Sequence, residues 1–140
     1  MKRFRFPLER ILGLYRSEER QARQTLVRAA RRVQELRDER QRVAEADRGL
    51  DLTRPGDRLY APVLAAKASV LDGLLNQAEA ERERARLRFL ERRSRRQSVS
   101  STKERALERW RLDANRAQAQ ELDEIGRSPF VREMRQEESA

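Results

Sequence analysis

The amino-acid sequence predicts an all-α protein, a long two-helix antiparallel coiled-coil hairpin with a longer C-terminal helix. Charged residues make up 41% of the chain and aromatic residues 5%, so the apolar residues suffice for one stripe along a helix and not for a globular core. These apolar residues also recur about every 3.5 residues, which is typical of helices packed in a coiled coil. We therefore expect residues 1–140 to form one domain.

The first predicted helix spans about residues 6–48 and is followed by a turn at about residues 49–57. Pro7 suits the first turn of a helix, where its missing N–H costs nothing. Pro55 and Gly56 mark the turn, because this dipeptide disfavours a helix. Alternating steps of four and three residues define a register with ten apolar positions out of thirteen: Leu8, Leu12, Tyr15, Glu19, Ala22, Leu26, Ala29, Val33, Leu36, Arg40, Val43, Asp47 and Leu50.

The second predicted helix spans about residues 58–125 and is followed by a flexible polar tail at about residues 126–140. Gly126 and Pro129 stand in the order that ends a helix. The residues between Ser98 and Thr102 are mostly poor helix formers, so the continuity of the helix there stays open. Eight of the eleven positions in the second register are apolar: Leu64, Ala68, Leu71, Leu75, Ala78, Arg82, Ala85, Phe89, Arg92, Arg96 and Val99.

The unequal helix lengths leave the end of the second helix without a partner helix. With the turn centred near Thr53, Leu8 lies opposite about residue 98. Exposed apolar groups in a row suggest a surface for a binding partner. The alternative is that this segment folds back or self-associates. The apolar residues of the overhang are Leu107, Trp110, Leu112, Ala114, Ala117, Leu122 and Ile125.

The composition also excludes several kinds of chemistry. The chain has no Cys and no His, which removes disulfides, thiolate metal sites and Cys or His catalysis. It has no Gly-rich phosphate loop, and a two-helix hairpin offers no concave pocket. We therefore expect no enzymatic activity and no cofactor or metal. No apolar run approaches the roughly 20 residues of a membrane span, so we also expect no direct membrane insertion.

The net charge of +9 raises nucleic-acid binding as the main alternative function. Between Arg82 and Arg96 there are eight Arg and two Glu, enough to neutralise phosphates. The run spreads around a helix, however, and Phe89 is its only aromatic residue, which disfavours base stacking. The alternative interpretation of the run is a solvated basic face or a patch for an acidic protein surface. A structural, self-associating coiled coil is a further alternative.

Short segments at both ends of the chain resemble the FliJ family, the small coiled-coil component of the bacterial flagellar type III protein-export apparatus. Stalk proteins of injectisome secretion are similar to that family. The length and the two-helix layout match over nearly the whole chain. The segments that carry the resemblance are residues 4–12 (FRFPLERIL), 16–22 (RSEERQA), 103–109 (KERALER) and 121–125 (ELDEI).

The resemblance implies a cytoplasmic stalk and chaperone-escort protein, peripheral at the inner face of the cell membrane, which also engages export chaperones. Both termini would enter the export ATPase hexamer, with Phe4, Phe6, Leu107, Trp110, Leu122 and Ile125 as candidate contacts. The hairpin tip would reach the cytoplasmic domain of the membrane export gate, with Leu50, Leu52, Leu59, Tyr60 and Val63 as candidate contacts. The resemblance does not explain the basic stretch between Arg82 and Arg96.

Overall fold

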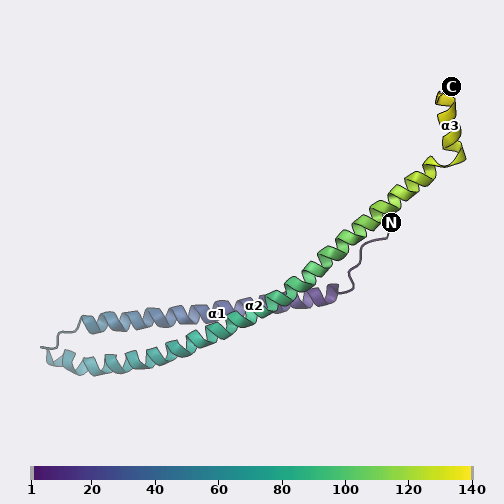
Figure 1. Cartoon of the computed structure of the whole chain (residues 1–140). Coiled ribbons are helices and arrows are strands. Elements are labelled where there is room, and N and C mark those ends of the chain that lie inside the picture. The colour runs from purple at the N-terminus through teal and green to yellow at the C-terminus, as the bar shows by residue number, and fades with distance from the viewer. Residues whose placement is uncertain (1, 140) are drawn as a thin grey trace. The chain divides into compact units, whose positions relative to one another are not determined.

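The computed structural model describes residues 2–139, except for the side chains of residues 130 and 131. Within this range there are three helices and no strand: α1 (Glu9–Arg48), α2 (Pro55–Gly126) and α3 (Pro129–Ser139) (Figure 1). The predicted all-α class is thus confirmed, with two long helices. The chain divides into two compact units. One is Gly13–Arg96, and the other joins the N-terminal segment up to Leu12 to the chain from Gln97 onward.

In the unit Gly13–Arg96, α1 and α2 lie side by side and share one apolar cluster (Figure 1). All nine buried residues of the described chain occupy positions of the two predicted registers, because a three-and-four spacing keeps one stripe turned toward a partner helix. The core is therefore a single seam. Its largest cluster consists of Val33, Leu36 and Val43 from α1 with Leu64, Leu71 and Ala78 from α2.

α1 begins at Glu9, later than the predicted start at residue 6. Phe6 precedes Pro7, and the proline ring disfavours the helical conformation at the residue before it. The carbonyl of Leu8 accepts the N–H of Leu12 at 2.9 Å, so Leu8 is the residue that caps the helix. Residues 2–6 consequently form an irregular segment.

α2 begins at Pro55, slightly before the predicted residue 58. The fixed φ angle of proline suits the first helical position, which needs no N–H donor. The carbonyl of Arg54 accepts the N–H of Arg58 at 3.1 Å as the first bond of this helix. The helix also continues through Pro62, which lies just beyond its first two turns.

Two aspartates organise the turn between α1 and α2. The Asp51 carboxylate accepts the Thr53 N–H at 3.0 Å and the Thr53 hydroxyl at 2.6 Å, and these bonds lower the pKa of Asp51. Asp57, in the first turn of α2, accepts the N–H of Asp51 at 2.9 Å. The turn is therefore held to the start of α2 by hydrogen bonds from the backbone to these two side chains.

α2 is continuous between Ser98 and Thr102, which answers the question that the sequence leaves open. The Thr102 hydroxyl donates to the carbonyl of Ser98 at 3.0 Å, one turn earlier. The hydroxyl is satisfied inside the helix and so does not draw the backbone into a turn.

The predicted flexible tail at residues 126–140 contains α3, so that prediction is corrected. Pro129 takes the first helical position, and the carbonyl of Ser128 accepts the N–H of Arg132 at 3.2 Å. Arg, Glu, Gln and Met, which make up much of this segment, are good helix formers despite their polar character as a group. No described helix is long and apolar enough to cross a membrane.

Leu36→Ala tests whether the single seam holds α1 and α2 together. Leu36 is 2% exposed, so we expect the free energy of unfolding to fall by about 2–5 kcal/mol. Urea unfolding followed by circular dichroism measures the change. Leu87→Ala is the matched control, because Leu87 is 54% exposed and its loss should change stability by less than about 0.5 kcal/mol. Equal losses in the two variants would contradict the seam.

Candidate partner-binding surfaces

The N-terminal segment contacts α2 within the unit that joins them. The rings of Phe4 and Trp110 lie 6.1 Å apart between centroids at an interplanar angle of 57°, a favourable tilted arrangement. The Lys103 ammonium pairs with the Glu9 carboxylate at 2.8 Å. The expectation that α2 lacks intramolecular cover past about residue 100 is therefore wrong for its first turns beyond that point.

The signal for this contact is present in the sequence. The second register continues from Val99 through Lys103, Ala106 and Trp110 in steps of four, three and four, and these four side chains are half-buried. A register that ends at Val99, just before the charged Lys103, does not include the residues of α2 that contact the N-terminal segment. The ammonium of a lysine can reach water while its stem covers apolar neighbours, so one lysine need not end a seam.

The six candidate ATPase contacts fall into two groups. Phe4, Phe6, Leu107 and Trp110 are half-buried, and the structure brings Phe4 and Trp110 together. Leu122 is 69% exposed and Ile125 is 60% exposed. Only these last two residues present largely free apolar side chains. A hollow beside Trp110 is lined by Ala114 and Ala117 together with Lys2, Asp113, Gln118 and Glu121.

Four of the five candidate gate contacts are exposed, namely Leu52, Leu59, Tyr60 and Val63. Leu50 is the exception, because it packs against the core cluster as the last apolar position of the first register. It is thus a core residue and not part of a free tip surface.

An exposed apolar row continues beyond the predicted tip residues. Ala66 and Val70 follow Leu59 and Val63 in steps of four, three and four, so the four residues share one face of α2. Val63 is 57% exposed and Val70 is 63% exposed. The two registers that predict the seam do not include this second face, although its apolar residues recur at the same four- and three-residue spacing.

Ion pairs link α1 to α2 where charged residues interrupt the registers. Glu19, Arg40, Arg92 and Arg96 all occupy register positions, and each pairs with a charge on the other helix. Such pairs contribute more than most surface pairs when they are partly buried and well aligned. The pairs are Glu18–Arg92 at 3.1 Å, Glu19–Arg96 at 2.7 Å, Arg37–Glu79 at 3.1 Å, Glu39–Lys67 at 3.8 Å and Arg40–Asp72 at 2.8 Å.

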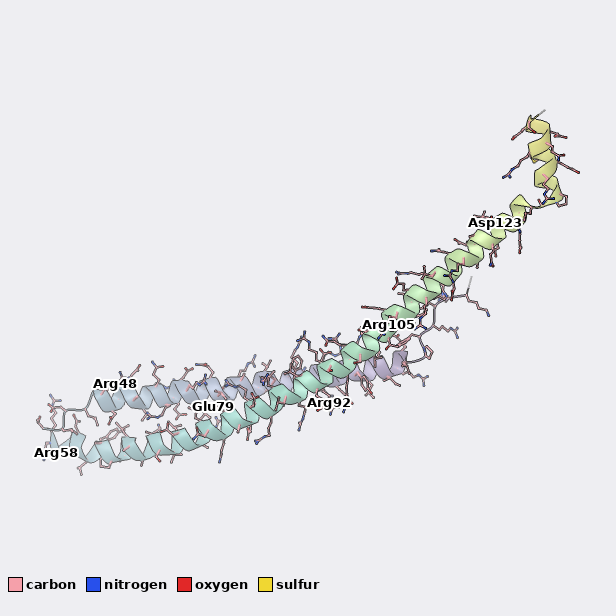
Figure 2. All side chains as sticks on the ribbon, in the orientation of Figure 1. Arg48, Arg58, Glu79, Arg92, Arg105 and Asp123 are labelled. Atoms are coloured by element: carbon pink, nitrogen blue, oxygen red, sulfur yellow. The ribbon has the colours of Figure 1, made fainter. Side chains whose placement is uncertain are left out.

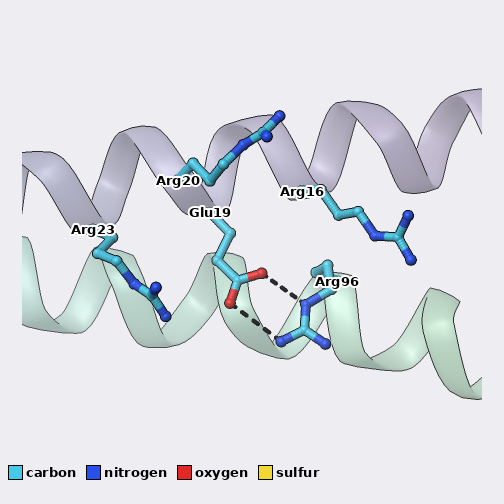
Figure 3. Close-up of a pocket in the computed structure, with 5 residues that line it drawn as sticks. All are labelled: Arg16, Glu19, Arg20, Arg23 and Arg96. Atoms are coloured by element: carbon cyan, nitrogen blue, oxygen red, sulfur yellow. Dashed lines mark hydrogen bonds and ion pairs between the residues drawn. The ribbon is translucent and has the colours of Figure 1, made fainter.

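The Glu19–Arg96 pair has the strongest geometry of the five (Figure 3). Two N–H groups of Arg96 donate to the two carboxylate oxygens of Glu19 at 2.7 and 3.2 Å, and the Glu19 side chain is only 13% exposed. The hydrogen bonds from Arg96 hold the pKa of Glu19 below its ordinary value, and the charges of Arg96, Arg23 and Arg93 act in the same direction against the effect of burial.

Further arginines surround this pair. Arg16, Arg20 and Arg23 of α1 line a shallow hollow together with Glu19 and Arg96. Arg16 and Arg23 extend toward α2 on either side of the pair, whereas Arg20 points away from it (Figure 3). The guanidinium of Arg23 lies 5.7 Å from the centroid of the Phe89 ring, a cation–π contact. None of the three α1 arginines forms an ion pair with a described residue.

The eight arginines between Arg82 and Arg96 occupy several faces of α2, because successive residues of a helix are turned by about 100°. Side chains project all round α2 near Glu79 and Arg92 (Figure 2). Half of these eight arginines are neutralised by carboxylates. The paired ones are Arg86 with Glu83, Arg92 with Glu18, Arg95 with Glu91 and Arg96 with Glu19.

No family model matches the chain, and searches of curated proteins and of solved structures find no significant similarity. Among residues 2–139, no group of acidic side chains is placed to hold a metal ion.

Glu19→Gln tests the contribution of the Glu19–Arg96 pair to stability. We expect a lower free energy of unfolding at neutral pH, because the variant loses a charge-assisted bidentate pair. The pKa of Glu19 is lower in the folded chain than the ordinary 4.5, so its contribution is present above pH 4.5 and is lost as the pH falls through the folded pKa.

Urea unfolding at a series of pH values therefore should show the wild type and Glu19→Gln converging in acid. Glu104→Gln is the control. Glu104 is exposed and forms no cross-helix ion pair with a described residue, so this substitution removes the same charge without breaking a pair. A constant difference between wild type and Glu19→Gln across the whole pH range would show that the charge of Glu19 does not matter.

Phe4→Ala tests the contact between the N-terminal segment and α2. The Phe4 ring shields Trp110, the only tryptophan of the chain, so its removal should shift the tryptophan emission to longer wavelength and increase quenching by acrylamide. Circular dichroism should stay unchanged, because residues 2–6 are not helical. Phe6→Ala removes a half-buried aromatic ring of the same segment and is the control. Identical spectra for wild type and Phe4→Ala would refute the contact.

Proposed function

We propose that this chain is an antiparallel two-helix coiled-coil hairpin with a longer C-terminal helix, and that it acts as a non-enzymatic stalk of the flagellar type III export apparatus. In this role it links the export ATPase ring to the membrane export gate and escorts export chaperones. The observation that carries the proposal is the presence of two separate exposed apolar surfaces in a chain whose charged residues make up 41% of the total. Each surface suits one of the two partners.

The ion pairs support the antiparallel arrangement. Glu18 pairs with Arg92, and Arg40 pairs with Asp72. The number of the α2 partner thus falls as the number of the α1 residue rises. The connection from Arg48 to Pro55 is short enough to return the chain directly, as in an αα-hairpin.

The end of α2 supports binding in an ATPase ring. Leu122 and Ile125 are exposed on a helix that is otherwise polar there, and burial of their apolar surface in a partner is favourable. The segment that holds them, residues 121–125, is also one of those that resemble the FliJ family. Leu107 and Trp110 contribute less free surface, since they are half-buried.

The start of α2 supports binding to the cytoplasmic domain of the export gate. Leu59, Val63, Ala66 and Val70 form an exposed apolar row next to the turn. Such a row at helical spacing fits a hydrophobic groove or a partner helix. Leu52 and Tyr60 add exposed apolar area beside it.

Nucleic-acid binding has weaker support than the stalk role. Half of the arginines between Arg82 and Arg96 are already paired with carboxylates. Phe89 is half-buried and lies under the guanidinium of Arg23, so it offers no free face for a base.

Mixing the protein with the export ATPase of the same bacterium tests the proposal. We expect the wild type to promote ATPase hexamers and to raise ATP turnover. Leu122→Ser with Ile125→Ser should weaken this effect about tenfold, because two exposed apolar contacts are lost. Leu87→Ser, which removes an apolar side chain 54% exposed in the middle of α2, is the control and should leave the effect intact.

Circular dichroism must show equal helicity for these variants. The stalk role is wrong if the wild type leaves ATP turnover and hexamer formation unchanged and if deletion of the gene leaves the bacterium motile.

A further inference from the structure

A cluster of arginines beside the seam has no use in the proposed stalk role. It consists of Arg16, Arg20 and Arg23 of α1 and Arg96 of α2, which line the hollow at Glu19 (Figure 3), together with Arg93 of α2, whose charge acts on the Glu19 carboxylate. We refer to these five residues as the arginine groove. All of them lie in the unit Gly13–Arg96, away in sequence from the apolar rows at the two ends of α2.

The arginine groove carries uncompensated positive charge. Glu19 is its only acid, and both oxygens of Glu19 are taken by Arg96. Arg16, Arg20, Arg23 and Arg93 form no ion pair with any residue of the described chain. Their guanidinium groups can therefore receive carboxylates or phosphates in the planar, two-point manner that Arg96 uses with Glu19, and Arg23 would do so from its position over the Phe89 ring.

The spacing of the free arginines matches a helical ligand. Arg16, Arg20 and Arg23 follow one another at four and three residues, so they run along one face of α1 over about 10 Å. Acidic side chains that recur at four and three residues on a partner helix have the same repeat. An arginine and a carboxylate can therefore meet at each step when the two helices lie side by side.

Apolar side chains extend the same face. Val27 follows Arg20 by two helical turns and is 43% exposed, and Leu90 precedes Arg93 by one turn and is 41% exposed. An amphipathic helix can cover these two residues with its own apolar side chains. Phosphates of a nucleic acid gain nothing from them, and the ring of Phe89 is already in contact with the guanidinium of Arg23.

We propose that the arginine groove is a binding site for an acidic amphipathic helix of a partner protein. Carboxylates of that helix pair with Arg16, Arg20, Arg23 and Arg93, and its apolar side chains pack on Val27 and Leu90. The site is independent of the stalk role, because it uses neither Leu122 and Ile125 nor the row from Leu59 to Val70.

Fluorescence anisotropy of the full-length protein with a labelled peptide tests the site. The probe is a helical Ala and Leu peptide that carries Glu at alternating four- and three-residue steps. A second peptide has Gln in place of every Glu. The triple variant Arg16→Gln, Arg20→Gln and Arg23→Gln should bind the acidic peptide about tenfold more weakly than the wild type, since three ion pairs are lost.

The matched control is the triple variant Arg10→Gln, Arg31→Gln and Arg42→Gln. These arginines are exposed on α1, lie outside the arginine groove and remove the same total charge. The control should retain wild-type affinity within about threefold, the scale of a general charge effect. Arg20→Glu changes only a side chain that points away from the seam, and it should also weaken binding. This single variant replaces the triple variant if the triple variant loses helicity.

Three outcomes would overturn the proposal. Equal losses in the two triple variants would mean that only net charge matters. Equal binding of the Gln peptide would remove the role of carboxylates. A duplex DNA that displaces the acidic peptide at a lower concentration than unlabelled peptide, and whose binding depends on Arg16, Arg20 and Arg23, would make the groove a nucleic-acid site instead.

Discussion

The packing of one apolar stripe of α1 against one apolar stripe of α2 is the interaction on which the unit Gly13–Arg96 depends. The fully buried side chains of the two helices all lie along this seam, whereas the apolar residues outside it stay exposed or half-buried. Val33 and Leu36 are almost fully covered, whereas residues one position away along the helix face water. Within the described residues, no buried side-chain nitrogen or oxygen lacks a hydrogen-bond partner. A core this narrow leaves the remaining surface of both helices available for contacts with other molecules.

The charged residues in the seam give it a defined alignment. Apolar side chains of similar size tolerate a shift of one heptad, since another apolar residue takes each place. A shift of that kind would part Glu19 from Arg96, its bidentate partner, and Arg40 from Asp72. The polar positions thus specify which residues face each other, and the apolar positions supply most of the attraction. The arginine groove lies next to one of these aligning pairs. Glu19 and Arg96 pair with each other, and the other arginines of the groove lie beside them without a carboxylate partner among the described residues.

Periodicity in the sequence was sufficient to predict the seam, since its residues depend on local spacing alone. It was less informative wherever the outcome depends on a particular neighbour. Pro7 keeps Phe6 out of α1. α3 begins at Pro129, directly after Ser128, although Gly126 indicates the end of a helix. The contact of Phe4 with Trp110 joins an irregular segment to a helix, so periodicity indicates only the Trp110 side of it. The arginine groove combines residues about 70 positions apart in the chain, so its composition follows only once the two helices are aligned.

The seam of the unit Gly13–Arg96 changes character along its length. Next to the turn it is built of Val33, Leu36, Val43 and their partners, whereas near its other end small alanines alternate with the ion pairs of Glu18 and Glu19. Hydrophobic contacts strengthen with added sulfate, while ion pairs weaken as ionic strength rises. We therefore expect rising ionic strength to weaken the contact between α1 and α2 first near Glu18 and Glu19 and last next to the turn.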